Sequence, residues 1–551
     1  MKSQYTISTY LLDRLHELGI EHIFGVPGDY NLAFLDDVVA HENLKWIGNC
    51  NELNAAYAAD GYARIKGIAA LITTFGVGEL SAINGIAGSY AENVPVIKIT
   101  GTPPTKIMEN GEIVHHTLGD GKFDHFSIMY REITVAQTNI TPEHAAEEID
   151  RVLRACWNEK RPVHINLPID VYNKPILYKP ILSNKETLDK MLLHANSIIN
   201  NAKKPVILAD FEVARFHAKE NLHQFVEKTG FPIATLSMGK GIFPEKHPQF
   251  IGIYTGDVSS PYLRKRIDES DCIISIGVKL TDTITGGFTQ GFTKEQVIEI
   301  HPYTVKIIDK TYGPVVMKDV LEQLSDLIEH RLEETLEMKS FISESLSMTE
   351  EFNPKAQMVT QKRFWQQIYH FLQENDVLIA EQGTPFFGSA AIPLPNNTAY
   401  VGQPLWGSIG YTLPALLGTQ LANLSRRNIL IIGDGSFQLT VQELSTILRQ
   451  NLKPIIFLIN NNGYTIERAI HGQNQPYNDI QMWDYTKLAN TFGSEEKSLT
   501  CKVENEIELA EVLTKINFNM NRLIFVEVVM SQGDQPELLA KLGERFGKQN
   551  S

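Results

Sequence analysis

Apolar positions along the first 175 residues alternate between helical and strand-like spacing. Four leucines near the start share one helical face: Leu11, Leu12, Leu15 and Leu18. Short, continuous apolar runs follow at 22–26, 69–74, 95–100 and 162–168, and helices are expected after Glu52 and around 82–91. Continuous apolar strands are typical of parallel sheets that are covered by helices on both faces. The pattern therefore predicts an α/β domain over residues 1–180.

The same alternation returns twice further along the chain. Residues 176–190 are polar and contain prolines, and the apolar run 204–209 then opens a second α/β block. A stretch with little periodicity, 337–361, leads into a third block from about residue 362. We predict an α/β protein of three domains, each with a parallel sheet flanked by helices, over residues 1–180, 190–340 and 360–551.

Length, composition and charge are those of a soluble multidomain protein. A chain of 551 residues exceeds what one hydrophobic core supports, and its hydrophobic fraction of 43% is ordinary. The formal charge of −15 argues against nucleic acid or an anionic membrane as a partner. Because neither a membrane-length apolar segment nor a signal peptide is recognisable, we expect a cytoplasmic protein. The four cysteines form no CxxC pair and are expected to be buried free thiols.

The strongest chemical signal is a pair of polar clusters that each follow an apolar strand. Gly433-Asp434-Gly435 follows the run 428–432, and Asn460-Asn461 follows 455–459. Val441, Leu444 and Leu448 mark one face of a helix between them, so both clusters are expected at the carboxyl ends of neighbouring parallel strands. Mg²⁺ prefers oxygen ligands, and the flanking glycines and helix start suit a diphosphate. Either string alone is most often a simple turn.

Together with other motifs, these clusters resemble the thiamine diphosphate-dependent 2-keto acid decarboxylases of the pyruvate, indolepyruvate and branched-chain type. The resemblance covers essentially the whole chain and includes 25–31, 51–55, 74–79 and the pair His115-His116. It implies an N-terminal pyrimidine-binding domain, a middle regulatory or scaffold domain and a C-terminal domain that binds the diphosphate and Mg²⁺. It also implies a homodimer or homotetramer with the active site at the subunit interface.

The resemblance also assigns chemical roles to individual residues. It makes Asp434, Asn461 and the Gly463 carbonyl the Mg²⁺ ligands, with Asn462 where Asp is frequent. It places Glu52 on the pyrimidine ring, where the carboxyl group assists formation of the C2 carbanion; a carboxylate that merely stabilises a helix N-terminus is the alternative. Four groups would move protons: Asp29, His115, His116 and Glu467. Without the resemblance, Asp29 would be read as a turn residue and the histidines as polar surface.

Further cofactor contacts follow from the same resemblance. The Gly407 carbonyl would accept a hydrogen bond from the aminopyrimidine, and Ile409 would wedge between the two cofactor rings, although an isoleucine among small residues is more often core. The remaining expected contacts are Thr74, Gly383, Thr384, Gly433, Gly435, Ser436, Tyr464, Thr465 and Ile466.

Substrate size is expected to depend on Gln382, Phe386, Phe387 and Ile466. Weaker candidates for the substrate pocket are Thr283, Ile284, Leu538 and Leu542, with Leu539 on the same C-terminal helix. Gln382 stands where strict pyruvate enzymes usually have Thr, which favours branched-chain and aromatic 2-keto acids, with pyruvate poorer. Ile466 narrows the pocket, so a large indole ring is a less certain fit. Because one methylene contributes only about 1–3 kcal/mol, we expect a ranked preference.

Other functions remain open at this point. An indolepyruvate-specific enzyme and a pyruvate decarboxylase are alternatives within the family. A carboligase similar to acetolactate synthase shares the metal motif, but the His115-His116 pair argues against it. Dinucleotide binding is disfavoured because 76–81 lacks the last glycine of GxGxxG. The presence of Glu52, Asp434 and Glu467 together argues against a non-enzymatic scaffold.

Overall fold

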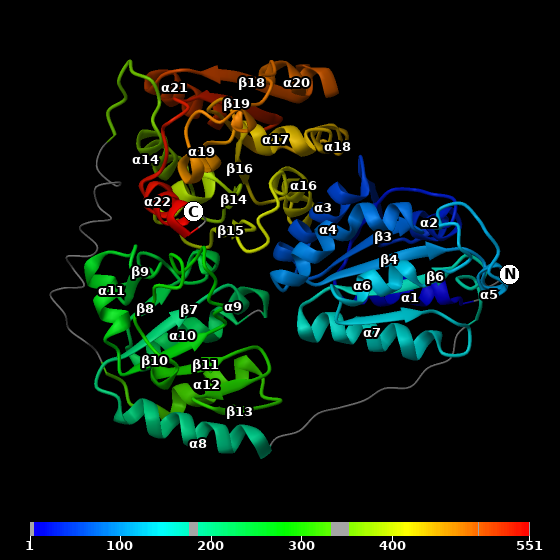
Figure 1. The fold of residues 1–551 in the computed structure, drawn as a ribbon, viewed down its shortest axis with the longest axis horizontal. Helices are drawn as coiled ribbons and strands as arrows, with labels where there is room; N and C mark the ends of the chain where they lie inside the picture. Colours follow the sequence, from blue (N-terminus) through cyan, green and yellow to red (C-terminus); the bar gives the residue numbers. More distant parts are fainter. Residues whose placement is uncertain (1–4, 176–185, 217, 332–351, 494, 550–551) are drawn as a thin grey trace.

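The computed structural model describes residues 5–175, 186–216, 218–331, 352–493 and 495–549, with side chains up to residue 543. Figure 1 shows three α/β units, one at each end of the chain and one between them. The prediction of three domains with parallel sheets flanked by helices is therefore confirmed. Most of the two stretches expected to separate the domains, 176–190 and 337–361, lies outside the described residues.

The N-terminal unit is a six-stranded parallel sheet with helices on both faces. The strand order is β2 (Lys45–Gly48), β1 (His22–Gly25), β3 (Ala69–Thr74), β4 (Val96–Thr102), β6 (Val163–Pro168) and β5 (Ala136–Asn139). The helices are α1 (Ile7–Glu17), α2 (Leu32–Ala40), α3 (Glu52–Lys66), α4 (Val77–Ala91), α5 (Thr105–Asn110), α6 (His125–Arg131) and α7 (Ala145–Glu159). The expected strands are present, and α4 starts five residues before the helix expected around 82–91.

The C-terminal unit repeats this strand order in a second six-stranded parallel sheet. Its strands are β15 (Ala399–Val401), β14 (Val377–Ala380), β16 (Asn428–Gly433), β17 (Ile455–Asn460), β19 (Leu523–Val529) and β18 (Ser498–Val503). Its helices are α14 (Gln361–Phe371), α15 (Thr384–Ser389), α16 (Thr412–Ala422), α17 (Asp434–Thr440), α18 (Glu443–Arg449), α19 (Thr465–His471), α20 (Tyr485–Phe492), α21 (Glu506–Asn517) and α22 (Glu537–Gln549).

The single helix predicted between the two polar clusters is wrong in one respect, because the structure has two short helices there. The first, α17, ends at Thr440, whose hydroxyl donates to the Gly410 carbonyl. The second, α18, begins at Glu443, which is fully buried and binds Asn49 of the N-terminal domain. The helix is thus interrupted where its residues contact distant parts of the chain. Helical spacing in the sequence does not reveal such contacts.

The middle unit has a seven-stranded sheet that is parallel except at one edge. Its order is β13 (Lys310–Tyr312), β12 (Val305–Ile307), β11 (Val297–Ile300), β10 (Cys272–Ile276), β7 (Pro205–Ala209), β8 (Ile233–Thr235) and β9 (Phe250–Ile253). The pairs β11–β12 and β12–β13 are antiparallel. Its helices are α8 (Glu186–Asn201), α9 (Glu212–Arg215), α10 (Lys219–Thr229), α11 (Pro261–Asp268) and α12 (Met317–Leu327).

One hydrophobic core joins the N-terminal and C-terminal units. Helix α3 lies against α16, and apolar residues from both helices belong to the same buried cluster. A Cβ on Gly418 would lie 1.9 Å from the Ala58 carbonyl oxygen, so the two backbones are in direct contact. Buried hydrogen bonds reinforce this packing: Tyr411 donates to Asp60 at 2.6 Å, and Arg64 donates to the Gly402 carbonyl at 2.9 Å. The two units are therefore held in a fixed arrangement.

The described residues also test two smaller expectations. All four cysteines are free, as expected, but only Cys156 and Cys272 are buried; Cys50 is exposed and Cys501 is intermediate. The expectation of four buried thiols is wrong for Cys50 because it lies in the turn before α3, where its thiol donates to the Gln442 carbonyl. Among the described helices, none has the length and apolar character needed to cross a membrane.

Candidate active site

The two polar clusters of the C-terminal domain meet at the carboxyl edge of its sheet. Strands β16 and β17 are parallel neighbours, with Gly433 paired to Ile459. Asp434 therefore starts α17 beside the turn that contains Asn461 and Gly463. The Asp434 carboxylate accepts hydrogen bonds from the Gly435 backbone N–H at 2.7 Å and from the Gly463 backbone N–H at 3.1 Å. Asp434 and Asn461 are both almost completely buried.

The turn after β17 has a backbone conformation that few residue types can adopt at position 463. Gly463 has φ of +110°, and a Cβ there would lie 2.2 Å from the Asn478 carbonyl oxygen. Arg468 holds this turn in place through hydrogen bonds. Its guanidinium donates to the carbonyls of Asn462, Gln473 and Asn478, although only 4% of the residue is exposed. The Gly463 carbonyl is thus carried on a rigid loop, as a metal ligand requires.

Burial raises the pKa of Asp434 to about 6, and hydrogen bonds from the backbone of Gly463 and Gly435 only partly offset this effect. A cation close to this carboxylate would offset the free-energy cost of burying its negative charge. Asn461 supplies an amide and Gly463 a backbone carbonyl in the same turn, so the donor set is one of oxygens, as Mg²⁺ prefers. The residues present therefore fit a divalent cation that is bound to a diphosphate.

A second group of polar residues lies at the carboxyl edge of the N-terminal sheet. Asp29 follows β1, and Oδ2 of its carboxylate lies 2.5 Å from Nε2 of His115. His116 is further away, with its Nδ1 3.8 Å from Oδ1 of Asp29. The Tyr30 ring stacks on the His115 imidazole at a centroid distance of 4.9 Å. The structure thus brings together three of the four groups expected to move protons.

The loop that carries the histidines rests on the turn before α4. Gly76 has φ of +62°, and a Cβ at that position would lie 2.0 Å from the His116 carbonyl oxygen. Thr74, at the end of β3, is buried, and its hydroxyl has no hydrogen-bond partner in the described part of the chain. A buried hydroxyl without a partner is uncommon and marks a place where a ligand group is expected.

Glu52 starts α3, with Asn51 as the N-cap that accepts a hydrogen bond from the Asn54 backbone N–H at 2.8 Å. Its carboxylate extends toward α4, where a Cβ on Gly78 would lie 3.2 Å from Oε1 of Glu52. Glu467, in contrast, is exposed on α19 in the other domain. Among the described residues, no ion pair joins Glu467 to His115 or His116.

Most of the expected substrate-pocket residues lie together at one end of the C-terminal domain. Phe386 and Phe387 on α15 form a buried cluster with Leu539 and Leu542 on α22, and Ile466 and Leu538 pack against it. Helices α19 and α22 lie side by side (Figure 1). Gln382 precedes this cluster, and its Oε1 is buried with no hydrogen-bond partner in the described residues. The apolar wall and one polar group are therefore adjacent.

Two of the weaker pocket candidates do not join this cluster. Ile284 is 1% exposed and packs in the core of the middle domain, with Leu208 and Tyr254. The Thr283 hydroxyl donates to the carboxylate of its neighbour Asp282 at 3.3 Å. Along the single chain, these two residues thus belong to the middle domain, whereas Phe386, Phe387, Leu538 and Leu542 form the wall.

Comparison with known proteins agrees with this geometry. Residues 5–127, 192–327 and 385–528 match the family models for the N-terminal TPP binding domain, the central domain and the C-terminal TPP binding domain of thiamine pyrophosphate enzymes. The chain is 43% identical over 544 residues to the alpha-keto-acid decarboxylases of Mycolicibacterium paratuberculosis and Mycobacterium avium. It is 42% identical over 555 residues to the one from Mycobacterium leprae, and each alignment covers 98% of this chain and 96% of the relative.

The chain belongs to the thiamine diphosphate-dependent 2-keto acid decarboxylase family. Membership confirms thiamine diphosphate as the cofactor expected from the sequence and assigns the two outer domains to its binding. The remaining expected cofactor contacts lie at strand ends, at helix starts and, for Gly407 and Ile409, in the turn between β15 and α16. Thr384 and Ser436 are buried, Gly383 and Gly407 have positive φ, and Ile409, Tyr464 and Thr465 lie in the adjoining segments.

Sequence reasoning missed several residues that shape the site of this decarboxylase. Glu381, directly before Gln382, is 1% exposed and accepts hydrogen bonds from both the backbone and the hydroxyl of Thr412. Burial raises its pKa to about 7. Ser408, in the segment with Gly407 and Ile409, lies 2.6 Å from the Tyr57 hydroxyl of α3. No sequence signal marks these residues, because each depends on a partner far away in the chain.

Proposed function

We propose that this protein decarboxylates branched-chain and aromatic 2-keto acids to the aldehyde and CO₂ without oxidation, and that it uses pyruvate less well. The observation that carries this proposal is the apolar wall of Phe386, Phe387, Leu539 and Leu542 beside Ile466 and the first turn of α19, which holds Glu467. A wall of this kind stabilises a branched or aromatic side chain by burial, whereas the methyl group of pyruvate gains little.

Mg²⁺ is part of the proposal, with Asp434, Asn461 and the Gly463 carbonyl as its protein ligands. Asp434 is the only one of the three that carries charge. Its burial in a turn held by Arg468 supports a metal role, because a hard cation would relieve the unfavourable desolvation of the carboxylate. The bound diphosphate would accept hydrogen bonds from the backbone at the start of α17.

Bound thiamine diphosphate would supply a carbon nucleophile and would take up the electron pair that is left behind when CO₂ departs. Glu52 is proposed to hold its pyrimidine ring through one carboxyl hydrogen bond, and the Gly407 carbonyl and Ile409 to hold it from the other domain. Asp29 and His115 form a hydrogen-bonded pair that is 47% and 59% exposed at the side chain, so protons can exchange with solvent. His116 and Glu467 would complete the set of proton-transfer groups.

The active site is proposed to form between two copies of the chain, in a homodimer or homotetramer. Within one chain, α3 already packs against α16, and Glu467 forms no ion pair with the Asp29 group among the described residues. Exposed apolar side chains remain near the cofactor segments: Val77 and Leu80 at the start of α4, Trp406, and Leu439 on α17. A second copy would cover these side chains and bring the two groups of acid–base residues together.

The direct test is aldehyde formation from four 2-keto acids in parallel: pyruvate, 3-methyl-2-oxobutanoate, phenylpyruvate and indolepyruvate. Each reaction is run with thiamine diphosphate and Mg²⁺ and again after their removal. We expect cofactor-dependent aldehyde release, with kcat/KM highest for 3-methyl-2-oxobutanoate and phenylpyruvate. Pyruvate as the best substrate would contradict the assignment of the pocket. Formation of 2-acetolactate without aldehyde would indicate a carboligase, and loss of activity when Mg²⁺ alone is withheld would support the metal site.

A further inference from the structure

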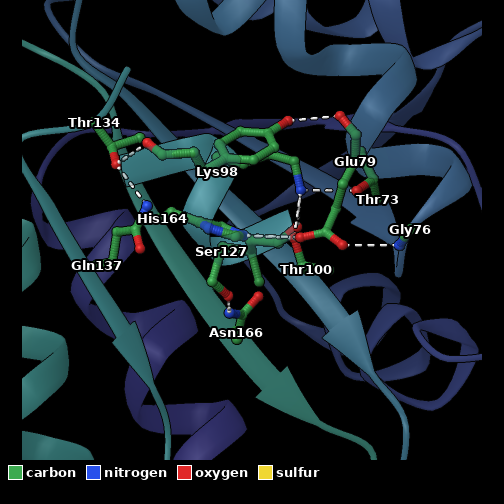
Figure 2. A network of polar contacts seen from close by, with 12 residues as sticks. Thr73, Gly76, Glu79, Lys98, Thr100, Ser127, Thr134, Gln137, His164 and Asn166 are labelled. Atoms are coloured by element: carbon green, nitrogen blue, oxygen red, sulfur yellow. Dashed lines mark hydrogen bonds and ion pairs between the residues drawn. The ribbon is translucent and has the colours of Figure 1, made fainter. Parts of the chain in front are cut away.

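A fully buried charged network lies behind the carboxyl edge of the N-terminal sheet. Lys98 on β4 is 0% exposed, and its ammonium group donates to the hydroxyls of Thr73 at 2.7 Å and Thr100 at 2.6 Å. Thr100 in turn donates to Oε1 of Glu79 at 3.1 Å. Figure 2 shows these side chains, from β3, β4 and α4, pointing toward one another. The two charges are thus bridged by one hydroxyl.

Two aromatic side chains complete the network. Nε2 of His164, on β6, lies 3.2 Å from Oε1 of Glu79, and burial lowers the pKa of His164 despite this contact. The pKa of Glu79 is lowered: burial alone would raise it, but the hydrogen bond and charge of His164, followed by the Lys98 charge and the Gly76 hydrogen bond, outweigh that effect. Tyr130 of α6 contributes the face of its ring, 5.7 Å from the Lys98 ammonium.

The network holds the turn between β3 and α4 from both sides. The Thr73 hydroxyl, which receives the Lys98 hydrogen bond, donates to the Thr74 carbonyl at 3.0 Å. On the other side of the turn, Oε2 of Glu79 accepts the Gly76 backbone N–H at 2.8 Å (Figure 2). Thr74 is an expected cofactor contact, and Gly76 supports the histidine loop. Removal of either charge therefore loosens a segment that carries functional groups.

The Lys98 charge also acts on Glu52. The first turn of α4 separates them, since a Cβ on Gly78 would touch Oε1 of Glu52, at 3.2 Å, and Cβ of Thr73, at 3.1 Å. Burial lowers the pKa of Lys98 to about 8, and the charges of Glu79 and Glu52 act in the opposite direction. Interactions between buried charges are screened less by solvent than those at a surface. Glu52 and Thr73, which accepts the Lys98 hydrogen bond, thus lie against the same first turn of α4.

We propose that Lys98 is a positioning residue of the active site, which fixes the 73–79 turn through Thr73 and Glu79 and provides the buried positive charge that holds the Glu52 carboxylate ready for the cofactor. This inference rests on the proposed role of Glu52. Lys98 touches neither cofactor nor substrate in this arrangement. Its effect therefore passes through Glu52 and the turn.

The test is calorimetric titration of the full-length protein with thiamine diphosphate and Mg²⁺ between pH 5 and 9, which requires no turnover. Lys98→Met keeps the length of the side chain and removes the charge. Lys160→Met is the matched control, because Lys160 is also buried in this domain with its pKa lowered by burial to about 8, but it faces the Trp157 ring. Both substitutions are also made in a Glu52→Gln background.

We expect Lys98→Met to weaken cofactor affinity about tenfold at pH 7 and to move the acidic fall in affinity upward by about one pH unit, the scale of one nearby charge. Lys160→Met is expected to match the wild type. In the Glu52→Gln background, Lys98→Met should change affinity less than twofold, because coupled residues are not additive. An equal loss in both backgrounds, or a wild-type profile for Lys98→Met, would overturn the proposal.

The same variants distinguish a failure of the Lys98 proposal from a failure of the proposed function. If Glu52→Gln alone binds the cofactor with the wild-type pH profile and retains normal turnover, the role of Glu52 is wrong, and the coupling to Lys98 is refuted with it. If Glu52→Gln is impaired but Lys98→Met is not, only the Lys98 proposal fails. If Lys98→Met unfolds, the double variant Lys98→Met/Glu79→Gln is used instead, because it removes both charges and keeps an acceptor for the Gly76 N–H. A wild-type pH profile of cofactor affinity in that variant would also overturn the proposal.

Discussion

Replacement of Asp434 by Asn is predicted to stabilise the cofactor-free protein while it abolishes stabilisation by the cofactor. Burial raises the pKa of this carboxyl from 3.8 to about 6. A shift of about two units corresponds to about 3 kcal/mol against folding when the group is ionised. Asn removes that unfavourable term but weakens hydrogen bonds from the Gly435 and Gly463 backbone, at a cost of about 1–2 kcal/mol. The net gain is about 1 kcal/mol.

The measurement is the thermal unfolding midpoint of both proteins, with and without thiamine diphosphate and Mg²⁺. For a domain of this size, about 1 kcal/mol corresponds to ~2–4 °C. At pH 7.5 without ligands, the Asp434→Asn protein should therefore unfold at the higher temperature. With cofactor and metal at about 100 times Kd, the wild type gains about 2.7 kcal/mol and the variant little, so the order reverses. Midpoints are compared because a three-domain protein need not unfold in two states.

The difference in stability between the two proteins depends on pH. Because the folded-state pKa of Asp434 is raised, the wild type suffers no penalty below pH 3.8, and the penalty grows as pH rises and is complete above about pH 6. The advantage of the variant without ligands should therefore vanish at about pH 5, where the remaining penalty equals the cost of the weakened hydrogen bonds, and reverse below that pH. Asp376→Asn is the control: Asp376 is equally buried but paired with Arg427 at 2.6 Å, so its loss should destabilise both ligand states. A ligand-free Asp434→Asn protein that unfolds below the wild type, or that keeps its Mg²⁺-dependent gain, refutes the reasoning.

Three further predictions concern the cofactor, the metal turn and the pocket. Glu52→Gln should keep the circular dichroism spectrum and lower kcat by roughly 10²-fold or more, the scale of lost acid–base assistance; near-normal kcat would remove Glu52 from the mechanism. Arg468→Met should weaken cofactor binding in calorimetric titration, because the carbonyls of Asn462 and Asn478 each lose one of their two donors; unchanged affinity would separate Arg468 from the metal turn. Leu542 is 0% exposed and belongs to the apolar wall, so Leu542→Ala should lower the unfolding midpoint. It should also raise kcat/KM for indolepyruvate relative to 3-methyl-2-oxobutanoate by about tenfold, and an unchanged ratio would contradict the assignment of the pocket.

The sequence predicted the features of the fold and site that depend on local pattern. The apolar runs before Asp434 and Asn461 became neighbouring parallel strands, because both faces of the sheet are buried and short connections favour adjacent strands. The three parallel sheets followed in the same way. Family resemblance supplied the grouping of Asp29 with His115, which lie 86 residues apart in the chain and meet at one edge of the sheet.

Residues whose importance depends on distant partners were not predictable. Lys98 lies in a run interpreted simply as an apolar strand, yet it is the buried cation of a network formed from β3, β4, β6 and α4. Ile284 illustrates the same point, since it packs in the middle-domain core with residues that its place in the sequence does not indicate. Periodicity reports whether a position is buried, but not which other segment it contacts.

The two cofactor-binding domains share one strand order, and this explains how their functional groups are divided. Glu52 follows the strand at one edge of its sheet, β2, and the 407–409 segment follows the corresponding strand of the other sheet, β15. Likewise, Thr74 ends β3, and Asp434 follows the corresponding β16. Within one chain, the equivalent helices α3 and α16 are packed against each other. A second copy would place the N-terminal set of one chain opposite the C-terminal set of the other, and it is this pairing that the proposed dimer requires.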